Sequence, residues 1–198
     1  MYLASASPRR RELLAQIGVE FEVVPALIDE QLRSSELPED YVVRLARAKA
    51  NAVWESVAKQ PQPRPVLAAD TAVVIDHRIL GKPDNEHEAL RMLELLSDRS
   101  HIVLTAIALR LGGTLETTLS TSEVRFRATT ATERAAYCHS GEPLDKAGSY
   151  AIQGIGAVFV ERLHGSYSGV MGLPLFETAA LLGKFGVPVW SEADQEAG

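Results

Sequence analysis

The sequence predicts an α/β protein with a mixed central sheet and helices packed around it. Strand-length and helix-length segments alternate in the first part of the chain, whereas strands follow one another directly later on. Of the 198 residues, 46% are hydrophobic and 23% are charged, which is ordinary for a folded protein and excludes intrinsic disorder of the whole chain. This length suits one α/β domain, or two small lobes around a cleft. We expect a single domain over 1–190 and a polar tail at 191–198.

The first part of the chain alternates between strands and helices. Residues 2–4 form a short strand. A helix over 8–17 follows, because serine and proline occupy its N-cap and first position and a glycine comes directly after it. A second strand covers 21–24. A long helix over 38–59 begins with a proline and carries its apolar residues on one face, and a proline-rich connector at 60–65 follows it.

Strands dominate the middle of the chain. Residues 66–75 form a mainly apolar strand, and 76–78 form a hairpin turn. Asp84 is expected to cap a helix whose leucines recur at helical spacing. Two long strands over 101–111 and 114–127 are joined by a pair of glycines.

The last part contains a helix, a long loop, a strand and a final helix. Thr132 is expected to cap a short helix that ends at a glycine. Residues 141–156 form a glycine-rich loop that is long enough to indicate a binding role. A strand over 157–162 and a helix over 174–182 complete the domain.

Composition narrows the class of function. Lysine and arginine number 20 against 26 aspartates and glutamates, so the net charge is −6. So acidic a chain is a poor candidate for binding nucleic acid, and any anion must be held by a local cluster of cations. The single cysteine, Cys138, excludes an internal disulfide and a cysteine-based zinc site. No apolar run approaches the roughly 18 residues that span a bilayer, and the start lacks a signal-peptide pattern, so we expect a cytoplasmic protein without membrane contact.

Three arginines crowd the first turn of the helix over 8–17, directly after Ser5 and Ser7. The partial positive charge of a helix N-terminus disfavours cations there, and a bound polyanion would reverse that penalty. We therefore expect a phosphate site. The alternative is a serine-capped helix with solvated arginines. Arg9 and Arg10 cannot point the same way on a helix, so we expect at least one of them to be structural.

Two charged residues lie within apolar patterns. Lys49 falls on the apolar stripe of its helix, where burying an ammonium group is costly unless it is paired. The alternative is a lysine whose stem packs while its head reaches water. Asp70 and Thr71 interrupt the apolar strand over 66–75, and a buried carboxylate there needs a partner, a metal or a raised pKa. The alternative is an aspartate at a strand end or bulge.

A third charge is placed by the predicted hairpin. If the chain turns at about His77, the returning segment brings Lys82 opposite residues 71–72 and beside Asp70. Two lysines and a carboxylate that converge on one region are typical of a phosphate and metal site.

The glycine-rich loop offers a group for base recognition. Its glycines permit close backbone approach to a ligand. The amide of Gln153 has both a donor and an acceptor, which suits the imide edge of uracil or thymine. The alternative is an ordered glycine-rich connection without a ligand.

Taken in order, these motifs resemble those of the Maf family, the nucleoside triphosphate pyrophosphatases also called septum formation inhibitor proteins. The resemblance runs from Tyr2 to about Gly183. It is carried by Ser5-x-Ser7-Pro8-Arg9-Arg10, Ala46-x-x-Lys49-Ala50, Ala69-Asp70-Thr71, Gly81-Lys82-Pro83, Asp145-Lys146-Ala147-Gly148-Ser149-Tyr150 and Gly172-Leu173-Pro174.

The resemblance implies an elongated α/β fold similar to inosine triphosphatases, with two lobes around a deep cleft. It implies a divalent cation, Mg²⁺ or Mn²⁺, and a homodimer. The family's proton acceptor maps onto Asp70, and its other essential polar residues map onto Glu30, Lys49 and Lys82. Positions that separate substrate classes map onto Arg9, Thr71 and Gln153, in a combination similar to the subfamily that hydrolyses dTTP and UTP.

We therefore expect an enzyme that converts dTTP and UTP into the monophosphate and pyrophosphate. The expected catalytic residues are Asp70, Glu30, Lys49 and Lys82, with Asp70 and Glu30 as metal ligands. The expected substrate-binding residues are Ser5, Ser7, Arg9, Arg10, Thr71 and Gln153. One alternative is a cell-division regulator that binds a nucleotide or a partner without essential catalysis. Another is a phosphatase for other nucleotides or modified bases.

Overall fold

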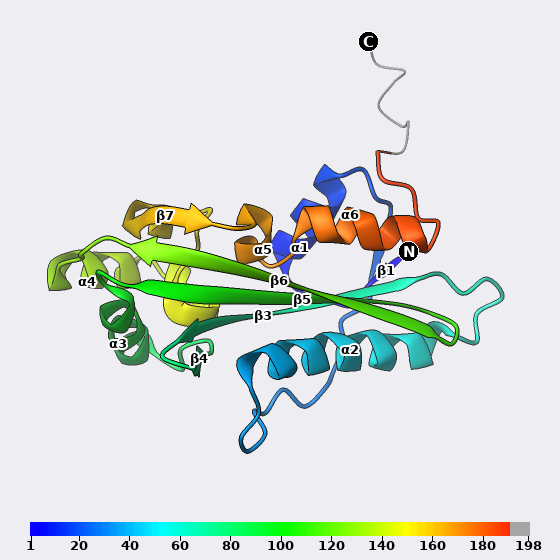
Figure 1. The fold of residues 1–198 in the computed structure, drawn as a ribbon, viewed down its shortest axis with the longest axis horizontal. Coiled ribbons are helices and arrows are strands. Elements are labelled where there is room, and N and C mark those ends of the chain that lie inside the picture. The colour runs from blue at the N-terminus through cyan, green and yellow to red at the C-terminus, as the bar shows by residue number, and fades with distance from the viewer. Residues whose placement is uncertain (191–198) are drawn as a thin grey trace, which may run out of the picture.

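The computed structural model describes residues 1–190, and the expected tail at 191–198 lies outside the described residues. The molecule is elongated and is built on one seven-stranded sheet (Figure 1). The strand order is β2-β1-β3-β5-β6-β7, and β4 pairs with β3 beside this path. Strand β1 runs parallel to β2 and β3, whereas every other pairing in the sheet is antiparallel. The predicted mixed α/β sheet is confirmed.

The elements lie close to their predicted positions. The strands are β1 (Tyr2–Leu3), β2 (Glu22–Val23), β3 (Val66–Ile75), β4 (Arg78–Leu80), β5 (Ser100–Leu111), β6 (Thr114–Phe126) and β7 (Val160–His164). The α-helices are α1 (Pro8–Gln16), α2 (Pro38–Val57), α3 (Glu86–Leu96), α4 (Ala131–His139), α5 (Tyr167–Met171) and α6 (Leu175–Lys184). Three short 3₁₀ turns are η1 (Glu142–Asp145), η2 (Ala147–Ser149) and η3 (Ile155–Phe159).

Several boundaries differ from the sequence prediction. Helix α3 is capped by Asn85 rather than Asp84, because the Asn85 side chain accepts the backbone N–H of Glu88. Helix α4 is capped by Thr130 rather than Thr132, through a reciprocal capping box with Glu133. Strand β7 starts later than predicted because η3 occupies residues 155–159, and the five-residue helix α5 was not predicted at all.

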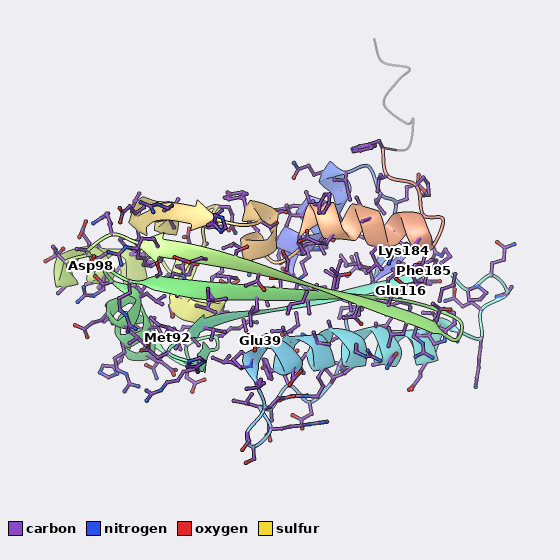
Figure 2. All side chains as sticks on the ribbon, viewed as in Figure 1. Glu39, Met92, Asp98, Glu116, Lys184 and Phe185 are labelled. Carbon is purple, nitrogen blue, oxygen red and sulfur yellow. The ribbon has the colours of Figure 1, made fainter. Side chains whose placement is uncertain are left out.

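Helix α2 covers one face of the sheet, and α1, α5 and α6 lie on the other (Figure 1). The apolar stripe of α2 packs on alternate residues of β3 and β5, with Val42 and Val66 fully buried between them. On the opposite face, α1 and α6 bury Leu14 and Leu182 against β3 and β5. Figure 2 shows Lys184 of α6 beside Glu116 of β6, where an ion pair of 2.8 Å ties the helix end to the sheet.

The outer edge of β3 is interrupted. Strand β1 pairs with Val66 and Leu67, and β4 pairs with residues 73–75. Within the described chain, residues 68–72 therefore have no strand partner on this edge. Side chains alternate along a strand, so Asp70 faces α2 while Thr71 faces α1 and α5. The gap lets residues from both faces of the sheet reach one space.

Among the described residues, no helix combines the length and the apolar character that crossing a membrane requires.

Candidate active site

A cavity of about 620 Å³ lies at the interrupted edge of β3. Its walls come from both ends of the chain and from both faces of the sheet, which agrees with the expected cleft. All ten residues predicted for the site line this cavity. They are Ser5, Ser7, Arg9, Arg10, Glu30, Lys49, Asp70, Thr71, Lys82 and Gln153. The volume is within the usual range for a small-molecule site.

A buried ion pair stands at the centre of the cavity wall. The Nζ atom of Lys49 donates to Oδ1 of Asp70 at 2.6 Å and lies 2.8 Å from Oε1 of Glu30. Lys49 and Asp70 are only 9% and 7% exposed, whereas the Glu30 side chain is 55% exposed. The alternative of a lysine head that reaches water is therefore wrong. Lys49 is held between two carboxylates, which offsets the cost of burying its charge.

The environment of Asp70 makes its carboxylate a stronger base than an exposed aspartate. Burial raises the pKa of Asp70, and the nearby positive charges of Lys49 and Arg10 only partly oppose this shift. A carboxylate with a raised pKa that faces a cavity is typical of a general base.

Arg10 is held rigidly by three segments. Its Nε donates to the carbonyl oxygen of Gly172 at 2.8 Å, Nη1 to Oγ of Ser5 at 3.3 Å, and Nη2 to Oγ1 of Thr71 at 3.1 Å. A guanidinium has five N–H groups, so one on each terminal nitrogen has no partner among the described residues. Arg10 is thus both structural and able to present a fixed pair of donors to an anion.

Arg9 reaches the opposite wall. Its Nη1 lies 3.6 Å from Oδ2 of Asp145 in η1, and Asp145 also contacts Lys146. Ser7 is the N-cap residue of α1, as predicted, although its side chain makes no capping bond and its backbone N–H donates to Oγ of Ser5. The alternative of solvated arginines is wrong for Arg9 and Arg10, since both pair with protein groups at the cavity.

Lys82 and Gln153 are exposed members of the site, as is Glu30. The observed pairing of β3 with β4 ends at Val73 and Leu80, so it does not reach Lys82. Lys82 lines the same cavity as Asp70, but the ion-pair partner of Asp70 is Lys49. Neither the ammonium of Lys82 nor the amide of Gln153 has a bonding partner within residues 1–190, so both are available to a ligand.

The loop that carries Gln153 is clamped from behind. Glu142 accepts hydrogen bonds from the Tyr137 hydroxyl at 2.7 Å and from the backbone N–H groups of Ile155 and Gly156 at 2.9 and 3.0 Å. The Tyr137 hydroxyl in turn accepts the N–H of Ala151 at 3.1 Å. These bonds fix the backbone on both sides of Gln153.

Comparison with known proteins identifies the family. The model of the family described as "Maf-like protein" matches residues 1–185. The chain belongs to the Maf family.

Its relatives include three proteins named dTTP/UTP pyrophosphatase. The one from Methylobacillus flagellatus is 54% identical over 96% of this chain and 94% of its own. Those from Saccharophagus degradans and Chromobacterium violaceum are 50% and 51% identical, over 96% and 94% of this chain and 90% and 94% of their own. The resemblance drawn from the ordered motifs is confirmed.

The donor set of this Maf protein fits a divalent cation only in combination with a phosphate ligand. No group of three or more His, Cys, Asp or Glu within residues 1–190 could hold a metal ion. Asp70 and Glu30 supply carboxylate oxygens on one wall of the cavity. Magnesium is commonly bound by one or two carboxylates, water and the phosphates of a substrate, and these two residues meet that requirement.

Sequence reasoning missed three residues of this Maf site. Asp145 and Lys146 line the cavity and lie in a quoted motif, but their charges were not assigned to the site. Tyr41 also lines the cavity, and its hydroxyl donates to the carbonyl oxygen of Glu30 at 3.0 Å. Nothing in the local pattern of α2 distinguishes Tyr41 from an ordinary packed tyrosine.

Proposed function

We propose that this Maf protein hydrolyses dTTP and UTP to the nucleoside monophosphate and pyrophosphate. The observation that carries the proposal is the buried Lys49–Asp70 pair on the wall of a cavity lined with further cations. Relatives about half identical to this chain over nearly its whole length bear the name of this activity. A cationic cavity in an acidic chain is the local cluster that a triphosphate requires.

The triphosphate would be held by cations from different segments. Arg10 presents two N–H groups in a fixed plane, and within residues 1–190 neither these groups nor the ammonium of Lys82 has a partner. Arg9 would exchange Asp145 for phosphate, since its ion pair of 3.6 Å is long and the Asp145 side chain is 65% exposed. The N-terminus of α1 adds backbone N–H groups beside them. Neutralisation of the leaving pyrophosphate by these charges is expected to be the largest catalytic contribution.

Asp70 would act as the general base. Its carboxylate takes a proton from water as the water oxygen forms a bond to the α-phosphorus, and the bond from that phosphorus to the bridging oxygen breaks to release pyrophosphate. Lys49 positions the carboxylate and favours its ionised form. Glu30 would pair with the same ammonium of Lys49 and so help to neutralise its positive charge on the cavity wall.

Two further properties are part of the proposal. As the alternative to its role as base, Asp70 would join Glu30 in holding Mg²⁺ or Mn²⁺ together with the phosphates, and this cation would polarise the phosphoryl oxygens. We also propose a homodimer, for which the exposed ring of Phe176 on α6 is one apolar contact surface. Light scattering coupled to gel filtration tests the dimer, and a monomeric mass at micromolar concentration would contradict it.

Product analysis tests the proposed reaction. The protein is incubated with Mg²⁺ and UTP, dTTP, CTP, ATP or 7-methyl-GTP, and nucleotides and inorganic products are separated. UTP and dTTP should yield monophosphate and pyrophosphate in equal amounts. Orthophosphate as the sole inorganic product would contradict the proposal, and preferential turnover of 7-methyl-GTP would contradict the substrate class.

The variant Asp70→Asn tests the role of the base. It should fold and bind nucleotide, because an amide oxygen can still accept from Lys49, and turnover should fall about a hundredfold or more. Asp40→Asn removes an exposed carboxylate from the first turn of α2 and serves as the matched control with unchanged turnover. Near-normal turnover of Asp70→Asn would remove Asp70 from the mechanism.

A further inference from the structure

Thr105 lies directly behind the cavity wall without lining the cavity. It stands on β5 opposite Thr71 of β3 in the antiparallel ladder and is only 1% exposed. Its Oγ1 donates to the carbonyl oxygen of Gly169 at 2.7 Å and lies 3.0 Å from Oγ1 of Thr71. The threonine therefore links a residue of the site to helix α5 on the sheet face above it.

Counting hydrogens sets the direction of these bonds. A threonine hydroxyl has one hydrogen and two lone pairs, and a carbonyl oxygen can only accept. The hydrogen of Thr105 is therefore used on Gly169, and Thr71 must be the donor in its bond to Thr105. Thr71 also accepts from Nη2 of Arg10 at 3.1 Å. The result is a one-way chain that runs from the guanidinium of Arg10 through both hydroxyls to the carbonyl.

This direction decides what Thr71 offers to a ligand. Its only hydrogen points away from the cavity toward Thr105, and one lone pair is taken by Arg10. Among residues 1–190 no other group uses the remaining lone pair, so Thr71 can meet a ligand only as a hydrogen-bond acceptor.

We propose that Thr105 is a positioning residue that makes Thr71 an acceptor toward the nucleotide, so that the nucleotide group that docks at Thr71 is a donor. This inference rests on the proposed function. Two donors of a uracil or thymine nucleotide satisfy it, the imide N–H of the base and a hydroxyl of the sugar. Cytosine has an acceptor in place of that imide N–H, so it would face the lone pair of Thr71 and be disfavoured.

The Thr105 hydroxyl is not needed to satisfy the carbonyl of Gly169. That oxygen also accepts the backbone N–H of Gly172 at 3.0 Å, at the end of α5. Removing the hydroxyl therefore leaves no unpaired carbonyl, and its main consequence is to free the hydrogen of Thr71.

Substitution at Thr105 tests the inference through selectivity. Thr105→Val keeps the shape of the side chain without its hydroxyl, and Thr105→Ser keeps the hydroxyl. If the base docks at Thr71, the preference for UTP over CTP in kcat/KM should fall about tenfold in Thr105→Val and return in Thr105→Ser. If the sugar docks there, that preference stays constant. Instead, the ratio of kcat/KM for UTP to kcat/KM for 2′,3′-dideoxyuridine triphosphate, which lacks the sugar hydroxyls, becomes smaller in Thr105→Val. A purely structural role would change all substrates by the same factor.

Two further measurements separate this inference from the proposed function. Calorimetric affinities for UMP and CMP give the same selectivity ratio without turnover, so the inference is tested even if the protein hydrolyses neither nucleotide. Neutron diffraction of the deuterium-exchanged protein should place the Thr71 deuteron between the two threonine oxygens. A deuteron of Thr71 directed into the cavity would overturn the inference. So would a Thr105→Val protein in which both the UTP-over-CTP preference and the penalty for the dideoxy nucleotide are unchanged, equal loss in Thr105→Ser, or no binding of either nucleotide.

Discussion

The buried imidazole of His101 should make this protein sensitive to mild acid. His101 is 2% exposed on β5, its Nε2 lies 2.8 Å from the hydroxyl of Tyr150, and the ring packs edge-on against Phe126 and Tyr150. Burial lowers its pKa from 6.5 to about 3, because a charged ring would lose its hydration. Since Tyr150 lines the cavity, the neutral form of His101 also supports the wall of the active site.

The size and sign of the effect follow from proton binding in the two states. The pKa of His101 is lower in the folded protein than in the unfolded chain, so between about pH 6.5 and pH 3 the unfolded chain binds more protons. The folded state is therefore progressively destabilised as the pH falls through this window. Between pH 7 and pH 5 the loss in the free energy of unfolding from this one residue is about 2 kcal/mol.

Urea denaturation at the two pH values measures this loss. Because other groups also titrate, the quantity to compare is the change in unfolding free energy between pH 7 and pH 5 for each variant. His101→Gln should show a change smaller than wild type by about 2 kcal/mol, whereas His87→Gln, at an exposed position on α3, should match wild type.

Equal pH dependence in wild type and His101→Gln would refute the reasoning. If His101→Gln does not fold, nuclear magnetic resonance of the wild-type imidazole decides the question, because its ring signals should show no protonation at pH 5. Protonation of His101 in the folded protein near pH 6 would show that burial does not hold this ring neutral.

Two other substitutions probe the site. Lys49→Met should lower the unfolding free energy by about 3 kcal/mol in urea denaturation, because it leaves the buried carboxylate of Asp70 without its nearest partner. In an Asp70→Asn background the same substitution should cost much less. Equal losses in the two backgrounds would show that the two residues are not coupled. Gly154→Ala should raise KM for UTP with little effect on kcat, because its Cβ would clash with the carboxylate of Glu142 and disturb the loop of Gln153. Its control is Gly113→Ala, where a Cβ would meet nothing within 4 Å, and an unchanged KM in both variants would argue against the clamp.

Local patterns were sufficient to predict most of the framework. Strand β3 was predicted with its observed bounds of 66–75, because a continuous apolar run between a proline-rich connector and a turn is typical of a buried strand. The helix over 38–59 was found from its apolar stripe and initial proline, and it ends at Val57. By contrast, the short helix α5 has only five residues, and a segment of that length contains too little periodicity to be detected.

The non-local features of the site could not be predicted from local patterns. The interrupted edge of β3 depends on where β1 and β4 stop pairing, which is a property of three separate segments. Glu30 was placed only by the family resemblance, because its loop has no periodic pattern, and its contact with Lys49 depends on how that loop folds back. Tyr41 and the clamp formed by Glu142 likewise depend on tertiary contacts.

The sequence analysis placed Lys82 rather than Lys49 beside Asp70, but the observed Lys49–Asp70 pair has a physical reason that applies beyond this chain. Lys49 and Asp70 each violate the apolar pattern of the element that carries them, and the free-energy cost of burying either charge alone would be several kcal/mol. One such violation has the simple solution of a side chain that reaches water. When two buried charges of opposite sign lie on a helix and a strand that pack against each other, an ion pair offsets the cost of burying both. The 2.6 Å contact between Lys49 and Asp70 is that ion pair. Such a pair adds little stability compared with a well-packed apolar core, so its presence on a cavity wall argues for a role in binding or chemistry.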